Sequence, residues 1–256
     1  MMSTIDVSKV EYPESDGRPM GETDLHRDAM FRHIELLKAY YCGQQVYVTG
    51  DLLLYYEEGN PKKFIVPDAF VAKGIAPGPR RVFLTWAERK VPDVVIETTS
   101  KKTKKRDVGF KPQLYAHLRI PEYFMYDPEQ DYLDPPLQGH RLRDDQYVQI
   151  EPDDDGSLIS DELGLKLIVE DDELQFYRMD TGQRLLTPAE RAEIEIEARH
   201  REEEARHREE EARHREEQAR HREEQARRQE HKARLAAEAE VARLRAELEL
   251  LKRQSK

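Results

Sequence analysis

The chain has 256 residues and a formal net charge of −11 at pH 7, and this charge is unevenly spread. Residues 190–256 hold 19 acidic and 18 basic side chains, so almost all of the net negative charge lies before them. Because phosphate contacts need cations, this balance argues against binding nucleic acid over a broad surface, although it leaves room for a local basic strip.

The single cysteine, Cys42, excludes an internal disulfide. No segment approaches the apolar length of a membrane span, and the first residues have neither an apolar core nor a basic start typical of a signal peptide. We therefore expect a soluble, cytoplasmic protein.

Residues 1–22 are polar and contain several Pro and Gly residues, which predicts an irregular N-terminal arm. The pattern changes at Thr23. Apolar residues then recur at helical spacing behind a Thr-Asp cap signal, which predicts a helix over residues 24–41.

Three runs rich in aliphatic and aromatic residues follow, at 46–48, 52–56 and 63–71. They predict an antiparallel meander that leads into Asp68. A carboxylate inside an apolar strand is costly unless it has a partner. A metal ion, an arginine or a turn at the strand end would each supply a reason for Asp68.

The segment from Pro92 to Pro128 predicts a strand, a basic loop, a helix and a second strand. The first strand ends at Glu97, and the basic loop spans residues 101–106. Magnesium prefers oxygen ligands and is usually held by one or two carboxylates, with water and phosphate completing its shell. Asp68 and Glu97 are therefore candidate ligands for a metal that assists phosphodiester hydrolysis.

Short alternating runs at 147–150, 165–169 and 174–177 predict hairpins that extend or cover the sheet. From residue 188 the composition changes to a seven-residue charged repeat with one alanine in each heptad. One small apolar residue per heptad is too little for a strong coiled-coil seam. We predict a long charged helix over 188–256, with a weakly self-associating end at Ala237, Val241, Leu244, Leu248 and Leu251.

These landmarks resemble a known family. Asp68 in VPDAFV, then PDVVIETTS, then DVGFK and LYAHLRIPEYFMYDP are similar in order and spacing to the bacterial Uma-type family, which belongs to the PD-(D/E)xK, restriction-endonuclease-like superfamily. The resemblance covers about residues 20–185. It implies an α/β (α+β) fold with a mixed central sheet flanked by helices, here over 23–187.

The resemblance also implies a site. Asp68 matches the PD aspartate and Glu97 the acid of the second half-motif, so both would bind Mg²⁺ or Mn²⁺. Thr99 stands where that half-motif places lysine, and Lys111 on the following helix is its best replacement. Lys111 would then orient the attacking water or stabilise developing charge.

Further residues are candidates for the same site, and each also has an ordinary structural role as its alternative. Asp107 lies one helical turn before Lys111, and the two would otherwise form an ordinary helical pair. Glu22, an acid near the first helix, and His26 would otherwise cap that helix or lie on the surface. A group of four lysines is a candidate for phosphate contact, with a solvated loop as its alternative: Lys101, Lys102, Lys104 and Lys105.

Two functions from different classes remain. The first is a metal-dependent DNA endonuclease whose C-terminal helix forms a homodimer or binds a partner. The second is a nuclease-like scaffold that no longer cuts and acts through its helix. The missing lysine at position 99 and the acidic balance favour the second, whereas intact Asp68, Glu97 and Lys111 favour the first.

Overall fold

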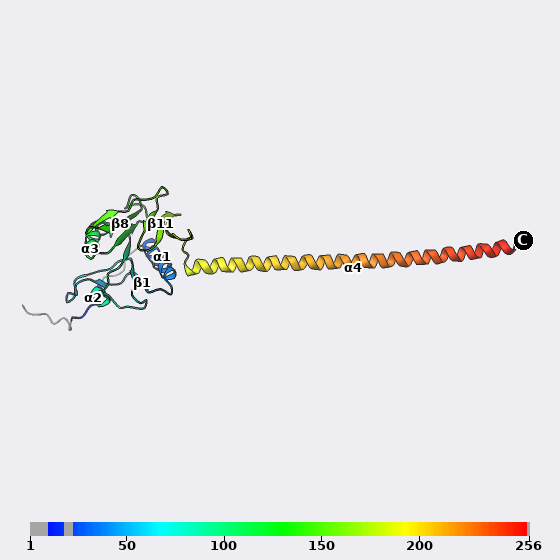
Figure 1. The fold of residues 1–256 in the computed structure, drawn as a ribbon, viewed down its shortest axis with the longest axis horizontal. Coiled ribbons are helices and arrows are strands. Elements are labelled where there is room, and N and C mark those ends of the chain that lie inside the picture. The colour runs from blue at the N-terminus through cyan, green and yellow to red at the C-terminus, as the bar shows by residue number, and fades with distance from the viewer. Residues whose placement is uncertain (1–9, 18–22, 255–256) are drawn as a thin grey trace, which may run out of the picture. The chain divides into compact units, whose positions relative to one another are not determined.

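The structure is a computed structural model that describes residues 10–17 and 23–254 (Figure 1). The chain divides into two compact units, Met1–Arg191 and Ala192–Lys256. The helical elements are α1 Asp24–Tyr40, α2 Thr85–Glu88, the π-helical turn η2 Arg106–Phe110, α3 Lys111–His117 and α4 Pro188–Gln254. The strands are β1 Val46–Thr49, β2 Leu54–Tyr55, β3 Phe64–Ile65, β4 Ala69–Lys73, β5 Phe83–Leu84, β6 Val94–Thr98, β7 Glu122–Tyr126, β8 Leu137–Arg143, β9 Gln146–Gln149, β10 Leu158–Ser160, β11 Leu165–Glu170 and β12 Glu173–Arg178.

A six-stranded sheet with the order β1-β4-β6-β7-β8-β9 organises the first unit. Its β6–β7 pair is parallel and its other pairs are antiparallel, so the sheet is mixed, as predicted. The crossover from β6 to β7 runs through η2 and α3. Two three-stranded sheets, β10-β11-β12 and β3-β2-β5, accompany it. The first contains the predicted runs 165–169 and 174–177, whereas the predicted run 147–150 forms β9 at the edge of the central sheet. The mixed α/β fold class is confirmed.

The central sheet is buried on both faces. Along β6 and β7, Val94 and Phe124 belong to one apolar cluster, with α1, whereas Val95 and Tyr123 belong to the other, with α3. Strand side chains alternate between faces. Glu97 therefore shares the face of Val95, on which α3 lies, and this places it within reach of helix side chains.

Helix α1 confirms the predicted first helix. The Thr23 hydroxyl accepts a hydrogen bond from the His26 N–H at 3.2 Å, which satisfies one of the N–H groups that a helix start leaves unpaired. One side of α1 is buried, and it contains Met30 and Leu37 together with two histidines, His26 and His33.

The predicted strand over 63–71 and the meander around it are wrong. The segment forms two strands, β3 and β4, which belong to different sheets, and β1 pairs with β4 while β2 pairs with β3 and β5. Pro67 lies in the break and has no N–H for a strand ladder. Its carbonyl instead accepts a hydrogen bond from the Asp51 N–H at 2.9 Å. Asp68 consequently stands just before β4 rather than inside a strand.

The start of α4 is a capping box. The Thr187 hydroxyl accepts from the Glu190 N–H at 3.2 Å, and the Glu190 carboxylate accepts from the Thr187 N–H at 2.7 Å. Pro188 occupies the first helical position, where its missing N–H costs nothing. The predicted long charged helix is confirmed from this point.

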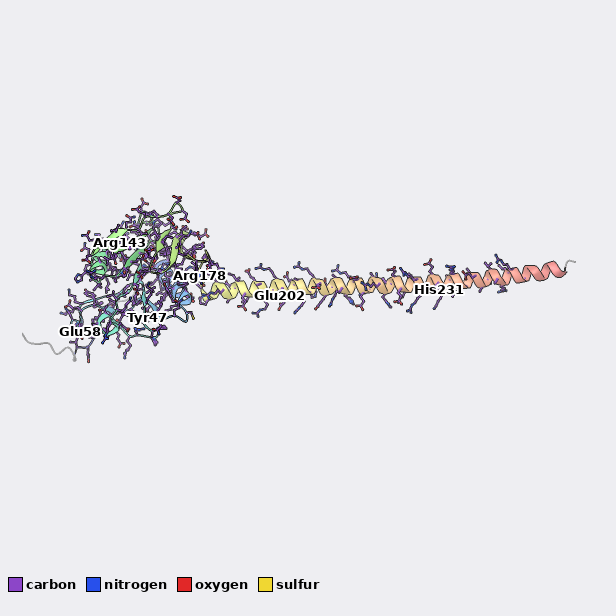
Figure 2. All side chains as sticks on the ribbon, in the orientation of Figure 1. Tyr47, Glu58, Arg143, Arg178, Glu202 and His231 are labelled. Carbon is purple, nitrogen blue, oxygen red and sulfur yellow. The ribbon has the colours of Figure 1, made fainter. Side chains whose placement is uncertain are left out.

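Charged side chains project from all sides of α4, as Figure 2 shows around Glu202 and His231. Glutamates precede arginines by four residues in a series of ion pairs, such as Glu204 and Arg208 at 2.9 Å. No helix among the described residues is long and apolar enough to cross a membrane.

Candidate active site

Asp68, just before β4, and Glu97, in β6, lie side by side where these two neighbouring strands of the central sheet pair. The Asp68 N–H donates to Glu97 Oε2 at 3.2 Å, and the Thr98 N–H donates to Asp68 Oδ2 at 2.8 Å. The pairing of Ala69 with Ile96 sets this register, so the two carboxylates meet at the end of the β4–β6 ladder. Glu97 is fully buried, whereas the Asp68 side chain keeps 18 % of its surface exposed.

Lys111 reaches this pair from the start of α3. Its ammonium lies 2.8 Å from Glu97 Oε2 and 2.7 Å from Asp107 Oδ1. Thr99 is fully buried, and its hydroxyl makes no hydrogen bond within the described part of the chain. The structure thus brings Asp68, Glu97, Asp107 and Lys111 together, although their roles in a reaction stay predictions.

The π-helical turn η2 explains how Asp107 and Lys111 come to share a face. The Lys111 N–H bonds to the Arg106 carbonyl, five residues back. The next residue, Pro112, has no N–H to continue the series. The Asp107 carbonyl instead accepts from the Tyr123 hydroxyl at 2.8 Å, which ties the turn to β7. Such π-helical turns frequently lie at functional sites.

Two more side chains complete the first contacts of the acids. Tyr115 donates its hydroxyl to Glu97 Oε1 at 2.5 Å, and His26 Nε2 lies 3.6 Å from Asp68 Oδ2. Tyr115 is not predicted as a site residue from the sequence. The signal that could have found it is its place four residues after Lys111, which puts both side chains on the same side of α3. His26 is buried beside Asp68 rather than on the surface, and Glu22 lies outside the described residues.

The acids of the site lie around one ammonium, and burial and neighbouring charges shift the pKa values of these acids. Burial raises the pKa of Glu97 to about 8, although the Lys111 ammonium opposes the shift, and burial also raises the pKa of Asp107. Burial alone would raise the pKa of Asp68, but the His26 hydrogen bond and the charge of Lys111 outweigh it and lower that pKa. Three carboxylates therefore compete for one ammonium.

The donor set suits a hard divalent cation in its chemistry. Asp68 and Glu97 offer oxygen ligands in a buried place with more negative than positive charge. Their arrangement is not a ready ligand cage, because Tyr115, Lys111 and the Asp68 N–H already engage both Glu97 oxygens. Among residues 10–17 and 23–254, no three His, Cys, Asp or Glu side chains are placed to hold a metal ion. Metal binding by Asp68 and Glu97 therefore stays a prediction.

A cleft of about 410 Å³ opens beside Asp68 and Lys111. Arg106 lines it, whereas the four lysines predicted to contact phosphate do not belong to its lining and are exposed: Lys101, Lys102, Lys104 and Lys105. Asp51, in a bend with φ of 49°, also lines the cleft.

Comparison with known proteins identifies the family. The model of the Uma2 family, described as "Putative restriction endonuclease", matches residues 6–179, and the chain belongs to this family. The predicted membership of the Uma-type family is confirmed. No curated protein matches the chain.

A solved structure is also similar. It is the crystal structure of a protein described as a "putative nuclease belonging to DUF820" from Anabaena variabilis. The two chains are 15 % identical, with a TM-score of 0.42, and the similarity covers 61 % of this chain and 87 % of the other.

Proposed function

We propose that the chain is a metal-dependent endonuclease that hydrolyses phosphodiester bonds of DNA. The observation that carries the proposal is the cluster of three carboxylates, Asp68, Glu97 and Asp107, around the single ammonium of Lys111 beside an open cleft. Membership of a family described as restriction endonucleases supports it.

Asp68 and Glu97 would hold Mg²⁺ or Mn²⁺. When bound, such an ion polarises a phosphoryl oxygen and lowers the pKa of a bound water. Lys111 would orient that water or stabilise charge on the phosphate, and the position of its ammonium among the acids supports this role. Asp107 fixes Lys111, and Tyr115 fixes Glu97.

We assign the function to a domain over residues 23–187, with the arm 1–22 before it and the helix 188–256 after it. The exposed lysines of the 101–105 loop would contact phosphates outside the cleft. The tail would join two copies or bind a partner, since Val241 and Leu244 of its predicted self-associating end are exposed on α4. Sedimentation at several protein concentrations would test the pairing of two copies.

The test is cleavage of plasmid, linear duplex and single-stranded DNA with Mg²⁺ or Mn²⁺, by the wild type and by Glu97→Gln, Asp68→Asn and Lys111→Met. We expect cutting that needs the ion and is lost in all three variants. Glu151→Gln, an exposed site outside the cleft, is the matched control and should cut like the wild type. Circular dichroism would check that each variant is folded.

The scaffold function is the second candidate. The observation in its favour is that both Glu97 oxygens are engaged by protein donors. If no form cuts DNA, and calorimetry detects no binding of Mg²⁺ or Mn²⁺, the nuclease proposal is wrong. Capture of partners by the full chain, compared with a chain ending at Arg191, would then test the scaffold.

A further inference from the structure

The cleft beside Asp68 has the size of a small-ligand site. Its volume of about 410 Å³ is in the range of roughly 300–1,000 Å³ typical of clefts that take one small ligand. Glu97 is fully buried and Lys111 nearly so, and only Asp68 keeps a modest exposed fraction. A phosphodiester can therefore approach these groups only by entering the cleft.

A duplex is poorly suited to that entry. It is stiff over many base pairs and carries its phosphates on the outside of a wide rod. A single strand can bend one nucleotide away from its neighbours, which lets a phosphate and its base enter a small cleft.

The walls of the cleft have the chemistry that binds single strands. Proteins that bind such strands combine cations for the phosphates with aromatic side chains on which bases stack. Arg27 from α1, Lys62 from the loop before β3 and Arg106 from η2 line the cleft, and the half-buried Phe64 of β3 lies among them. The Phe64 ring packs against Tyr55 with centroids 5.6 Å apart, which holds it in place.

The cleft also contains carboxylates that do not suit phosphate. Asp16 and Asp51 line it together with Asp68. Binding there should therefore be weaker without a divalent cation than with one, because the acids would repel an unshielded phosphate.

We propose that the cleft admits single-stranded nucleic acid and not an intact duplex, with Phe64 stacking on a base and with Lys62 and Arg106 contacting phosphates. The inference rests on the proposed nuclease function for its biological meaning. It concerns binding, however, and binding is measured separately from cutting.

The experiment is fluorescence anisotropy with a labelled single-stranded oligonucleotide and with the same sequence closed as a hairpin duplex. The full chain carries Lys111→Met, which leaves both proposed metal ligands in place, so that bound strands are not cut in Mg²⁺ buffer, and the same variant is measured in EDTA. We expect the single strand to bind at least about tenfold more tightly than the duplex, and Mg²⁺ to strengthen binding.

Variants in the cleft should weaken single-strand binding. Phe64→Leu should reduce affinity by about 5- to 100-fold, which is the range for one lost base stack. Phe64→Trp should retain the affinity, because both replacements are apolar but only tryptophan keeps an aromatic ring for stacking. The logarithm of the binding constant falls linearly with the logarithm of the salt concentration, and Lys62→Ala and Arg106→Ala should each make this slope less steep by about 0.7. Tyr132→Ala and Arg143→Ala, outside the cleft, are the aromatic and charge controls and should bind like the parent. Thermal unfolding would confirm that the Phe64 variants are folded.

The outcomes separate this inference from the proposed function. Equal affinity for hairpin and single strand, or Phe64→Leu binding like Phe64→Trp, would overturn the inference even if the wild type cuts DNA. Binding that prefers single strands and depends on Phe64 would support it even if no form cuts, in which case the nuclease proposal alone is wrong.

Discussion

The buried carboxylate of Glu97 is stabilised by a small set of hydrogen-bond donors. Among the described residues, the Tyr115 hydroxyl donates to Oε1 at 2.5 Å. Tyr115→Phe would leave that oxygen buried without this donor, so we expect a loss of about 1–3 kcal/mol in the free energy of unfolding. Urea denaturation would measure it. Nuclease activity should fall with it, because Glu97 would lose its fixed orientation.

Tyr132→Phe is the matched control for this prediction. Its hydroxyl also donates to a glutamate, Glu129, at 2.5 Å, but the group lies at the surface. We expect little change in its denaturation midpoint. A Tyr115→Phe protein as stable as this control would show that the Tyr115 hydroxyl is unimportant for Glu97.

His33 is a single residue that makes the folding stability depend on pH. It is fully buried between Tyr126 and Phe176, and burial, helped by the neighbouring Arg32, lowers its pKa from 6.5 to about 3. Between these values the unfolded chain binds a proton at His33 that the folded chain does not. His33 therefore costs stability as pH falls from about 6.5 toward 3, by up to about 1.4 kcal/mol per pH unit.

His33→Phe keeps a ring in this place and removes the titration. The stability of the wild type relative to His33→Phe should therefore decline as pH falls from 7.5 to 5, as measured by urea denaturation at each pH. Taking the difference cancels groups common to both proteins, such as Glu97. Curves that run parallel across this range would contradict the low pKa. His117→Phe, at an exposed position, is the control.

Gly50 shows at the element scale how strand packing places a site residue. A Cβ atom there would lie 1.8 Å from the Asp68 carbonyl oxygen and 2.6 Å from Ile34 Cδ1. Real side chains cannot approach so closely, so Gly50→Ala must push the backbone of Asp68 away. We expect a loss of stability of about 1–3 kcal/mol, measured by urea denaturation, and weaker cutting, because Asp68 would shift relative to Glu97.

Gly109→Ala is the comparison for this change. No atom lies within 4 Å of the place where its Cβ would be, and Gly109 also lies close to the site, in η2. We expect it to be tolerated. A Gly50→Ala protein as stable and active as Gly109→Ala would mean that the close approach is relieved without moving Asp68.

The elements that the sequence predicts well are those with a strong local pattern. Helix α1 has both its apolar period and its Thr23 cap, and β6 and β7 are apolar runs bounded by turn residues. The break at Pro67 was harder, because the pattern of residues 63–71 is that of one strand and only the tertiary pairing of β1 with β4 divides it. The same limit applies to the site. Local motifs identify Asp68 and Glu97, whereas the hydroxyl of Tyr115 meets Glu97 only once α3 is packed on the sheet.

The start of α4 is held by contacts of a single carboxylate, Glu190. Glu190 caps its own helix and also lies 3.1 Å from Arg32 and 3.0 Å from Arg184, so its carboxylate fixes the helix start to the first unit. These cations and the Thr187 N–H lower the pKa of Glu190 to about 2. A truncated chain must keep this residue to be a fair test of the tail.

Removal of residues 192–256 is therefore the informative truncation. The second unit is held by its own ion pairs between residues four apart, such as Glu204 with Arg208 and Glu216 with Arg220. A chain ending at Arg191 should unfold at the same urea concentration as the full chain. A chain ending at Thr187 should lose about 0.5–2 kcal/mol, because the capping box and the Glu190 contacts are gone. Equal destabilisation by both truncations would mean that the tail itself stabilises the first unit.

The same two chains test how the tail is stabilised. Exposed ion pairs are screened by salt, whereas apolar packing between copies is not. The circular dichroism difference between the full chain and the chain ending at Arg191 reports helix in the tail. If the charged pairs dominate, this difference should shrink as sodium chloride is raised and should be independent of protein concentration. A difference that grows with concentration would instead show that copies associate, as predicted for the end that contains Val241 and Leu244, and a dimer of the proposed nuclease could then present two clefts to one substrate.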